Sequence, residues 1–209
     1  MLKDNAKEAS SASIKTFQKD GFLIYRDGVS AEECRNAKAF VLESLSPLIG
    51  PAELEVDVGY SGAPRAAADE GGETPRRLLH AYGRSPILRK FALDQKVKGM
   101  ICELMDESDV MLSQCHHNCV MTKYPRYSSS TGWHQDIRYW HYDLPELITV
   151  WIALDREDES NGSLKVIPGS HKIDFERGDF DKDLFFREDK EPNRSLIQER
   201  VSVELNQGD

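Results

Sequence analysis

The sequence predicts a mainly β fold with helices at its N-terminal end. Helical patterns are concentrated before residue 107, and short segments typical of strands follow it. The apolar residues change there from a spacing of three to four residues to alternation, which are the periods of a helix and of a strand. Helices followed by many short strands favour a β-barrel or sandwich with helices packed on one side. We expect one domain over residues 1–209, with helices in 17–106 and strands in 107–209.

The N-terminal part begins with a short helix end, a turn at Gly21 and a brief apolar strand within residues 17–25. Ser30 and Glu33 then form a capping-box pattern. The serine hydroxyl accepts from the backbone N–H of Glu33, whose carboxylate reaches back to the backbone of Ser30. The next apolar residues recur at helical spacing, so a helix is expected here (Ala37, Phe40, Val41, Leu45 and Leu48).

Residues 50–74 are rich in Gly, Ala, Pro and acidic residues and show no sustained period, which predicts a long loop. Helical signals return at 77–82. Ser85 followed by Pro86 predicts a further helix start, since proline suits the first helical position. Another helix is expected at 95–105.

Strands are expected at 110–124, 148–154, 163–167 and 196–205, where apolar residues alternate or cluster in short runs. Asn161-Gly162 predicts a hairpin turn and Pro168-Gly169 a second turn. The charged run within 173–195 reads as a solvated loop, with a lid over a site as the alternative. A Gly-Asp turn ordinarily leads into another strand, so the ending at Asp209 predicts that the last strands of the sheet lie outside this sequence.

The composition excludes several classes of protein. Acidic residues number 36 against 27 basic ones, giving a net charge of −9, which argues against a nucleic-acid binder. No stretch has the length of a membrane span, and residues 1–13 lack the apolar core of a secretory signal. The four cysteines show no disulfide spacing. We therefore expect a cytoplasmic protein with reduced thiols, and nothing in the sequence indicates an oligomeric state.

The strongest local motif is Thr131-Gly-Trp-His-Gln-Asp136. Side chains two positions apart on a strand point to the same face, so His134 and Asp136 are expected to converge. An imidazole and a carboxylate suit Fe(II), and two histidines with one carboxylate form a site that leaves positions open for oxygen. As an isolated pattern His-x-Asp is common, so the spacing alone does not establish a metal site.

A second motif covers residues 151–172 and reads as strand, polar loop, strand and tight turn. Local backbone requirements explain Asn161, Gly162, Pro168 and Gly169. Taken together, the two motifs resemble the phytanoyl-CoA dioxygenase family. The matching residues, in chain order, are Asp20-Gly-Phe-Leu-Ile24, Trp133-His-Gln-Asp136, Trp151, Asn161-Gly-Ser-Leu164 and Pro168-Gly-Ser-His-Lys172.

The resemblance implies a double-stranded β-helix (a cupin-like jelly roll) with N-terminal helices, incomplete at its C-terminus here. It also implies Fe(II) and 2-oxoglutarate as cofactors, with His134 and Asp136 as catalytic metal ligands. The implied reaction is hydroxylation of a small organic substrate by O2, with decarboxylation of 2-oxoglutarate to succinate. Halogenating relatives replace the carboxylate ligand with a small residue, so Asp136 favours hydroxylation.

Four further residues are implied near 2-oxoglutarate. Trp151 matches a tryptophan that lines the cosubstrate pocket, and Cys119, four residues before Lys123, stands where relatives place an apolar residue. Arg77 matches a basic residue on a preceding helix. The family's second histidine ligand and its carboxylate-binding arginine follow a turn like residues 207–209, so neither is expected within this sequence. His171 belongs to a turn and is not expected to be the missing ligand.

Three alternatives stay open. Cys115, His117 and Cys119 would share one face of a strand and suggest zinc, but a structural zinc site needs four ligands. Strand residues inside or beside the oxygenase pocket are the favoured interpretation of these three. The protein could also be a catalytically inactive binding module of the same fold. A cupin-type hydrolase or isomerase would use His134 and Asp136 with zinc or manganese. The aromatic cluster at 139–142 suits either rim packing or substrate contact.

Overall fold

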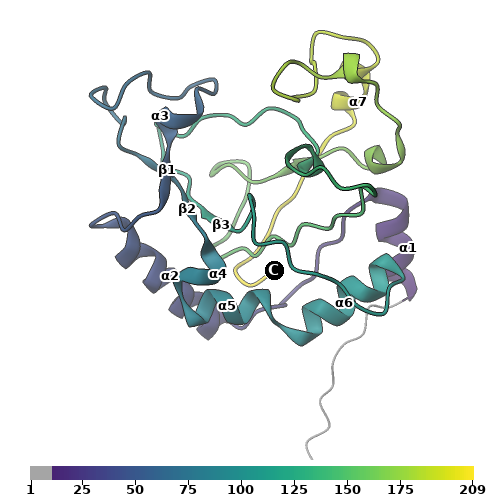
Figure 1. Cartoon of the computed structure of the whole chain (residues 1–209), viewed down its shortest axis with the longest axis horizontal. Coiled ribbons are helices and arrows are strands. Elements are labelled where there is room, and N and C mark those ends of the chain that lie inside the picture. The colour runs from purple at the N-terminus through teal and green to yellow at the C-terminus, as the bar shows by residue number, and fades with distance from the viewer. Residues whose placement is uncertain (1–10) are drawn as a thin grey trace, which may run out of the picture.

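The computed structural model describes residues 11–209, so the expectations for the first ten residues lie outside the described part. The long helices gather along one edge of the molecule, as Figure 1 shows. Helix α2 (Ala31–Leu45) packs against α5 (Pro86–Ala92), and α1 (Ser11–Asp20) packs against α6 (Gln95–Met105). No helix within residues 11–209 is long and apolar enough to cross a membrane.

The helix starts expected from the sequence are confirmed at α2, α5 and α6. At α2 the Ser30 hydroxyl accepts from the Glu33 N–H at 3.2 Å, and the Glu33 carboxylate accepts from the Ser30 N–H at 3.2 Å. At α5 the Ser85 hydroxyl accepts from the Ile87 N–H, one residue after proline at the first helical position. The Asp94 carboxylate caps α6. Each cap satisfies N–H groups that have no partner within the helix.

A three-stranded antiparallel sheet, in the order β1-β2-β3, stands beside these helices. Strand β2 (Pro75–Leu79) contradicts the helix expected at 77–82; helix α4 is confined to Ala81–Arg84. The buried positions of β2 are Arg76 and Leu78, with exposed fractions of 1% and 0%. Because an arginine fills a buried position, the sequence does not show the alternation of apolar and polar residues that marks a strand. The expected loop at 50–74 was also wrong in part, because it contains β1 (Ala52–Leu54) and α3 (Glu55–Val58).

The second half has less regular β-structure than expected. The strand expected at 110–124 is reduced to β3 (Cys119–Met121), and the one at 163–167 to β4 (Lys165–Val166). Residues 22–25 and 148–154 form no strand, and 196–205 contains the end of helix α7 (Asn193–Gln198) and strand β5 (Val201–Ser202). Alternation predicts an extended chain, but a strand also needs a neighbouring chain that pairs with it. The division into parts at residue 107 stays a prediction.

A small apolar core joins distant parts of the chain in this second half. Ala153, Val203 and Leu205 are buried together, and Phe22, Ile24, Trp151 and Val166 pack against them. The end of the chain is fixed at the same place, because the Gly208 N–H donates to the Ala153 carbonyl at 2.9 Å. The expected turn at Pro168-Gly169 is confirmed: Gly169 has a φ of 77° and precedes the short 3-10 helix Ser170–Lys172.

Candidate functional site

His134 and Asp136 come together, but in a conformation other than the expected strand. Residue 134 lies in an irregular segment and Asp136 begins a 3-10 helix, Asp136–Tyr139. The His134 Nε2 atom lies 3.4 Å from Asp136 Oδ1. The His134 Nδ1 atom lies 2.8 Å from the Gly132 carbonyl oxygen, which only accepts hydrogen bonds. Nδ1 therefore donates to this carbonyl, and Nε2 is the ring atom that faces Asp136.

The Asp136 carboxylate is held in its ionised form. Burial alone would raise its pKa, but hydrogen bonds from His134 and Thr149 and the positive potential of His117 bring the pKa to about 2. The Thr149 hydroxyl donates to Oδ2 at 2.7 Å. Two imidazoles approach the other oxygen, since His117 Nε2 lies 3.3 Å from Oδ1. Oδ1 is therefore the point where the polar groups of the site converge.

His117 belongs to this site rather than to a zinc cluster. Its segment forms a bend before β3, so Cys115, His117 and Cys119 do not share a strand face. Within residues 11–209 no group of three or more His, Cys, Asp or Glu side chains is arranged to hold a metal ion. Burial lowers the pKa of His117, and its ring packs edge-on against Tyr139 at 5.0 Å between centroids. Sequence reasoning expected His117 inside or beside the pocket, with zinc as the alternative, but it did not predict the contact with Asp136.

The aromatic residues that follow Asp136 pack on the same segment. The Tyr139 ring stacks on His116 at 5.4 Å, and the Trp140 indole N–H donates to the Ser113 hydroxyl at 3.0 Å. Tyr142 stacks on Trp140 with its own side chain largely exposed. For Tyr139 and Trp140 these contacts agree with the packing interpretation of the cluster.

Arg77 and Cys119 lie on the sheet beside this site. Arg77 is on strand β2, not on a helix, which corrects the expected position of this residue. The strand register pairs Leu79 with Cys119 and Arg77 with Met121, so Arg77 and Cys119 share one face of the sheet. Arg77 Nε lies 3.2 Å from Glu53 Oε1. Burial raises the pKa of the Cys119 thiol, which keeps it neutral.

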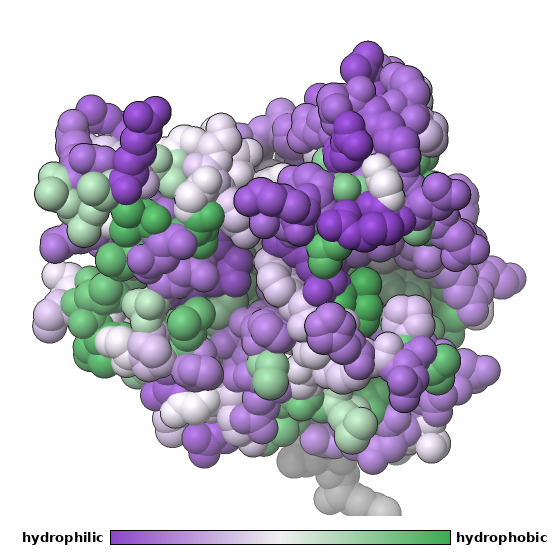
Figure 2. All heavy atoms as spheres, turned by 45° about the horizontal axis from the view of Figure 1, so that its top comes forward, coloured by the Kyte–Doolittle hydropathy of each residue, from purple (hydrophilic) through white to green (hydrophobic). Residues whose placement is uncertain are grey.

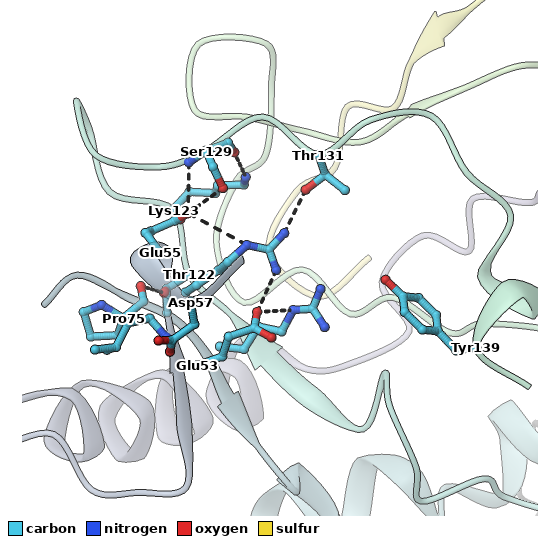
Figure 3. A network of polar contacts seen from close by, with 12 residues as sticks. Glu53, Glu55, Asp57, Pro75, Thr122, Lys123, Ser129, Thr131 and Tyr139 are labelled. Atoms are coloured by element: carbon cyan, nitrogen blue, oxygen red, sulfur yellow. Dashed lines mark hydrogen bonds and ion pairs between the residues drawn. The ribbon is translucent and has the colours of Figure 1, made fainter. Parts of the chain in front are cut away.

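A buried polar network connects the sheet to the start of the motif, as Figure 3 shows. Arg76 donates to Glu53 at 2.9 Å and to the Thr131 hydroxyl at 2.8 Å. The fully buried Glu55 accepts from the Ser129 N–H at 3.0 Å. These bonds fix the backbone just before His134. We call this group the sheet network (Glu53, Glu55, Arg76, Arg77, Lys123, Ser129 and Thr131).

Lys123 is part of the sheet network, where its ammonium donates to the Ser129 carbonyl at 3.1 Å. Burial lowers its pKa, and the neighbouring Arg76 acts in the same direction. Counted in their ionised forms, Arg76, Arg77 and Lys123 face two carboxylates, Glu53 and Glu55. The sheet network therefore holds three basic side chains beside two carboxylates.

A cavity of about 330 Å³ lies on the same side of the sheet. Arg77 and Glu53 form one wall and Tyr139 another, and Figure 3 shows Tyr139 across an open space from Glu53. Leu79 is the one aliphatic residue of its lining (Glu53, Tyr60, Arg77, Leu79, His80, Gln114, His116, Asn118 and Tyr139). The cavity is therefore polar and aromatic, and Arg77 lines it.

Trp151 and His171 contact residues outside the site formed by His134 and Asp136. The Trp151 indole N–H lies 3.0 Å from both carboxylate oxygens of Glu157, and its ring packs on the apolar core. His171 lies against the end of α1, with Nε2 3.3 Å from the Gln18 carbonyl. Of the residues expected around the cosubstrate, the structure thus brings Arg77, Cys119 and Lys123 together and leaves Trp151 with the core.

The sequence matches the family model for phytanoyl-CoA dioxygenase (PhyH) over residues 17–209. The chain belongs to this family. Ectoine dioxygenase from Nocardia farcinica is 27% identical over 171 residues, covering 79% of this chain and 52% of that protein. Phytanoyl-CoA dioxygenase 1 from Oryza sativa is 21% identical over 228 residues, covering 98% and 80%. The chain spans about half the length of the ectoine dioxygenases that it matches.

Solved structures show the same fold as this member of the family. AviO1 from Streptomyces viridochromogenes Tue57 aligns with a TM-score of 0.61 and 18% identity, covering 95% of this chain and 80% of that one. The non-heme alpha-ketoglutarate-dependent carbocyclase SnoK from nogalamycin biosynthesis aligns with a TM-score of 0.62 and 19% identity, covering 97% and 73%. The overall fold is thus shared with these two proteins, although regular strands are short here.

Proposed function

We propose that this protein is an Fe(II)- and 2-oxoglutarate-dependent oxygenase that hydroxylates a small organic molecule with O2. The observation that carries the proposal is the approach of His134 Nε2 to Asp136 Oδ1 at 3.4 Å. The family match and the fold support it. The similarity in fold also supports the finer proposal that the extended segments of the second half belong to a double-stranded β-helix.

The two side chains fit a first-row metal. Such metals hold imidazole and carboxylate ligands at roughly 2.0–2.2 Å, so two ligands at right angles lie roughly 3 Å apart. His134 and Asp136 are close to this separation before any metal enters. His134 is held through Nδ1 by Gly132, and Asp136 through Oδ2 by Thr149, so both free atoms face the same point. Hydrogen bonds behind metal ligands orient them in this way.

We assign two protein ligands to the proposed site, His134 and Asp136. When bound, iron and 2-oxoglutarate supply the oxidising chemistry and yield succinate. The chain's own residues orient the metal and the substrate and limit the access of water.

For the cosubstrate we propose contacts with Arg77, Cys119, Lys123 and Trp151. Arg77 has the strongest support, because it lines the cavity and a guanidinium suits a carboxylate. Cys119 shares its face of the sheet, and Lys123 lies in the same network. Trp151 rests on the resemblance alone. The polar lining of the cavity favours a small polar substrate over a long acyl chain.

The proposal is tested by following succinate formation from 2-oxoglutarate with candidate substrates, in air and without O2. We expect turnover that requires O2 and Fe(II) and is lost in Asp136→Ala. Conversion of a substrate without O2 and without succinate formation would indicate a metal-dependent hydrolase or isomerase instead. Folded protein with no turnover for any substrate, and with no binding of 2-oxoglutarate, would indicate an inactive binding module.

A further inference from the structure

Residues 173–195, which we call the Phe185 segment, form a compact unit with an aromatic cluster of its own. The rings of Phe175, Phe180 and Phe186 lie 4.9–5.8 Å apart between centroids. The fully buried Asn193 closes the unit, because its amide donates to the carbonyls of Asp179 and Arg187, each at 2.9 Å. Figure 1 shows the segment as a projection next to α7, and Figure 2 shows that its outer surface is mainly hydrophilic.

One aromatic ring of the segment faces away from this cluster. Phe185 lies edge-on to His134, with 5.8 Å between centroids and an angle of 90°. It is also edge-on to Tyr60 at 5.2 Å. A Cβ atom at Gly132 would lie 3.0 Å from the Phe185 ring, so the ring is seated directly on the residue whose carbonyl holds His134.

Two anchors hold Phe185 in place, one on each side of Asp136 in the sequence. The Phe186 N–H donates to the Trp133 carbonyl at 2.7 Å. The Arg138 guanidinium lies over the Phe185 ring, with Cζ 4.0 Å from its centroid, and donates to the Asp183 carbonyl at 3.1 Å. A cation at this distance is attracted to the face of the ring. The segment therefore docks on the motif through both its backbone and this ring.

We propose that Phe185, held by Arg138, is a positioning residue for His134. The hydrogen bond to Gly132 fixes the direction of Nδ1, but it leaves the imidazole free to tilt about that bond. The Phe185 ring removes this freedom and keeps Nε2 toward Asp136. The metal-binding consequence rests on the proposed function, whereas the contact between Phe185 and His134 does not. Partners that orient a ligand are worth roughly 10–100-fold in metal affinity.

The test compares Phe185→Ala and Phe185→Tyr with Phe175→Leu, a matched change in the same segment that leaves the His134 contact intact. Binding of Co(II) is measured in each folded variant. We expect Phe185→Ala to weaken binding about tenfold, Phe185→Tyr to restore it and Phe175→Leu to leave it unchanged. Equal affinities in Phe185→Ala and Phe175→Leu would overturn the proposal.

A second measurement separates this inference from the proposed function. In metal-free protein, the imidazole resonances of His134 are recorded by nitrogen-15 NMR. We expect Phe185→Ala to shift and broaden these signals relative to the wild type, which Phe175→Leu should not do. Unchanged signals in Phe185→Ala would refute the positioning role. If no variant binds Co(II), the proposed metal site fails, and the NMR result still decides the role of Phe185.

Discussion

The His134–Asp136 pair lies between two supports with different chemistry. On one side the sheet network joins buried charges, with Arg76 at 1% and Glu55 at 0% exposure. On the other side the Phe185 segment contributes one aromatic ring and a guanidinium stacked on it. The first support fixes the backbone before His134, and the second contacts the imidazole itself. We infer that damage to the network lowers stability, whereas damage to the ring contact alters the site while the fold persists.

The largest expected effect follows from this difference. Arg76→Met removes the cation that faces Glu53 and Glu55 and leaves their buried charge without this partner. Removing one member of a buried ion pair costs about 3–5 kcal/mol. Chemical denaturation should show this loss in the free energy of unfolding. The matched change Arg156→Met, at a side chain that is 71% exposed, should have little effect. Equal losses of unfolding free energy in the two variants would contradict the stabilising role given to the sheet network.

An intermediate effect is expected from acid. The pKa of Asp136 falls from 3.8 to about 2 in the folded protein, because the hydrogen bonds and nearby imidazoles outweigh burial. A folded-state pKa below the unfolded value stabilises the protein above the unfolded pKa, and this contribution is lost as pH falls toward 2. Thermal unfolding of metal-free protein should therefore show a smaller loss of stability between about pH 4 and 2 in Asp136→Asn than in the wild type. Identical slopes would show that Asp136 has no depressed pKa.

The smallest effect is expected at Thr149, which belongs to neither the sheet network nor the Phe185 segment. Thr149→Val keeps the shape of the side chain and removes the hydrogen bond to Asp136. A hydrogen bond to a charged group contributes about 1.5–3 kcal/mol, and partial exposure of the pair places the expected loss near the lower end. The pKa of Asp136 should rise, which carbon-13 NMR of its carboxyl group measures. A pKa equal to that of the wild type would contradict the role given to Thr149.

The sequence was sufficient where a structural signal and its partner lie within a few residues. The caps of α2 and α5 are of this kind, since the Ser30 and Ser85 hydroxyls each accept from a backbone N–H two or three residues ahead. The convergence of His134 and Asp136 was also predicted, although the reason was wrong because Asp136 begins a 3-10 helix. Their role as iron ligands stays a prediction.

Contacts between distant segments were out of reach for sequence reasoning. Strand β2 was hidden because Arg76 fills a buried position with a charged residue, stabilised by partners on other segments. The approach of Phe185 to His134 has no local signal, since it depends on how residues 173–195 fold and dock. The strand expected at 148–154 does not form, because an extended segment also needs a neighbouring segment to pair with.

The most direct test of the central claim is anaerobic titration with Fe(II) in the presence of 2-oxoglutarate, followed by the visible absorption of the complex. We expect binding in the wild type and in Asp155→Ala, whose carboxylate is 62% exposed and pairs with Lys38. Asp136→Ala should bind Fe(II) at least about tenfold more weakly and lose the absorption. Equal binding by the wild type and Asp136→Ala, or no binding by either, would contradict the assignment of iron to His134 and Asp136.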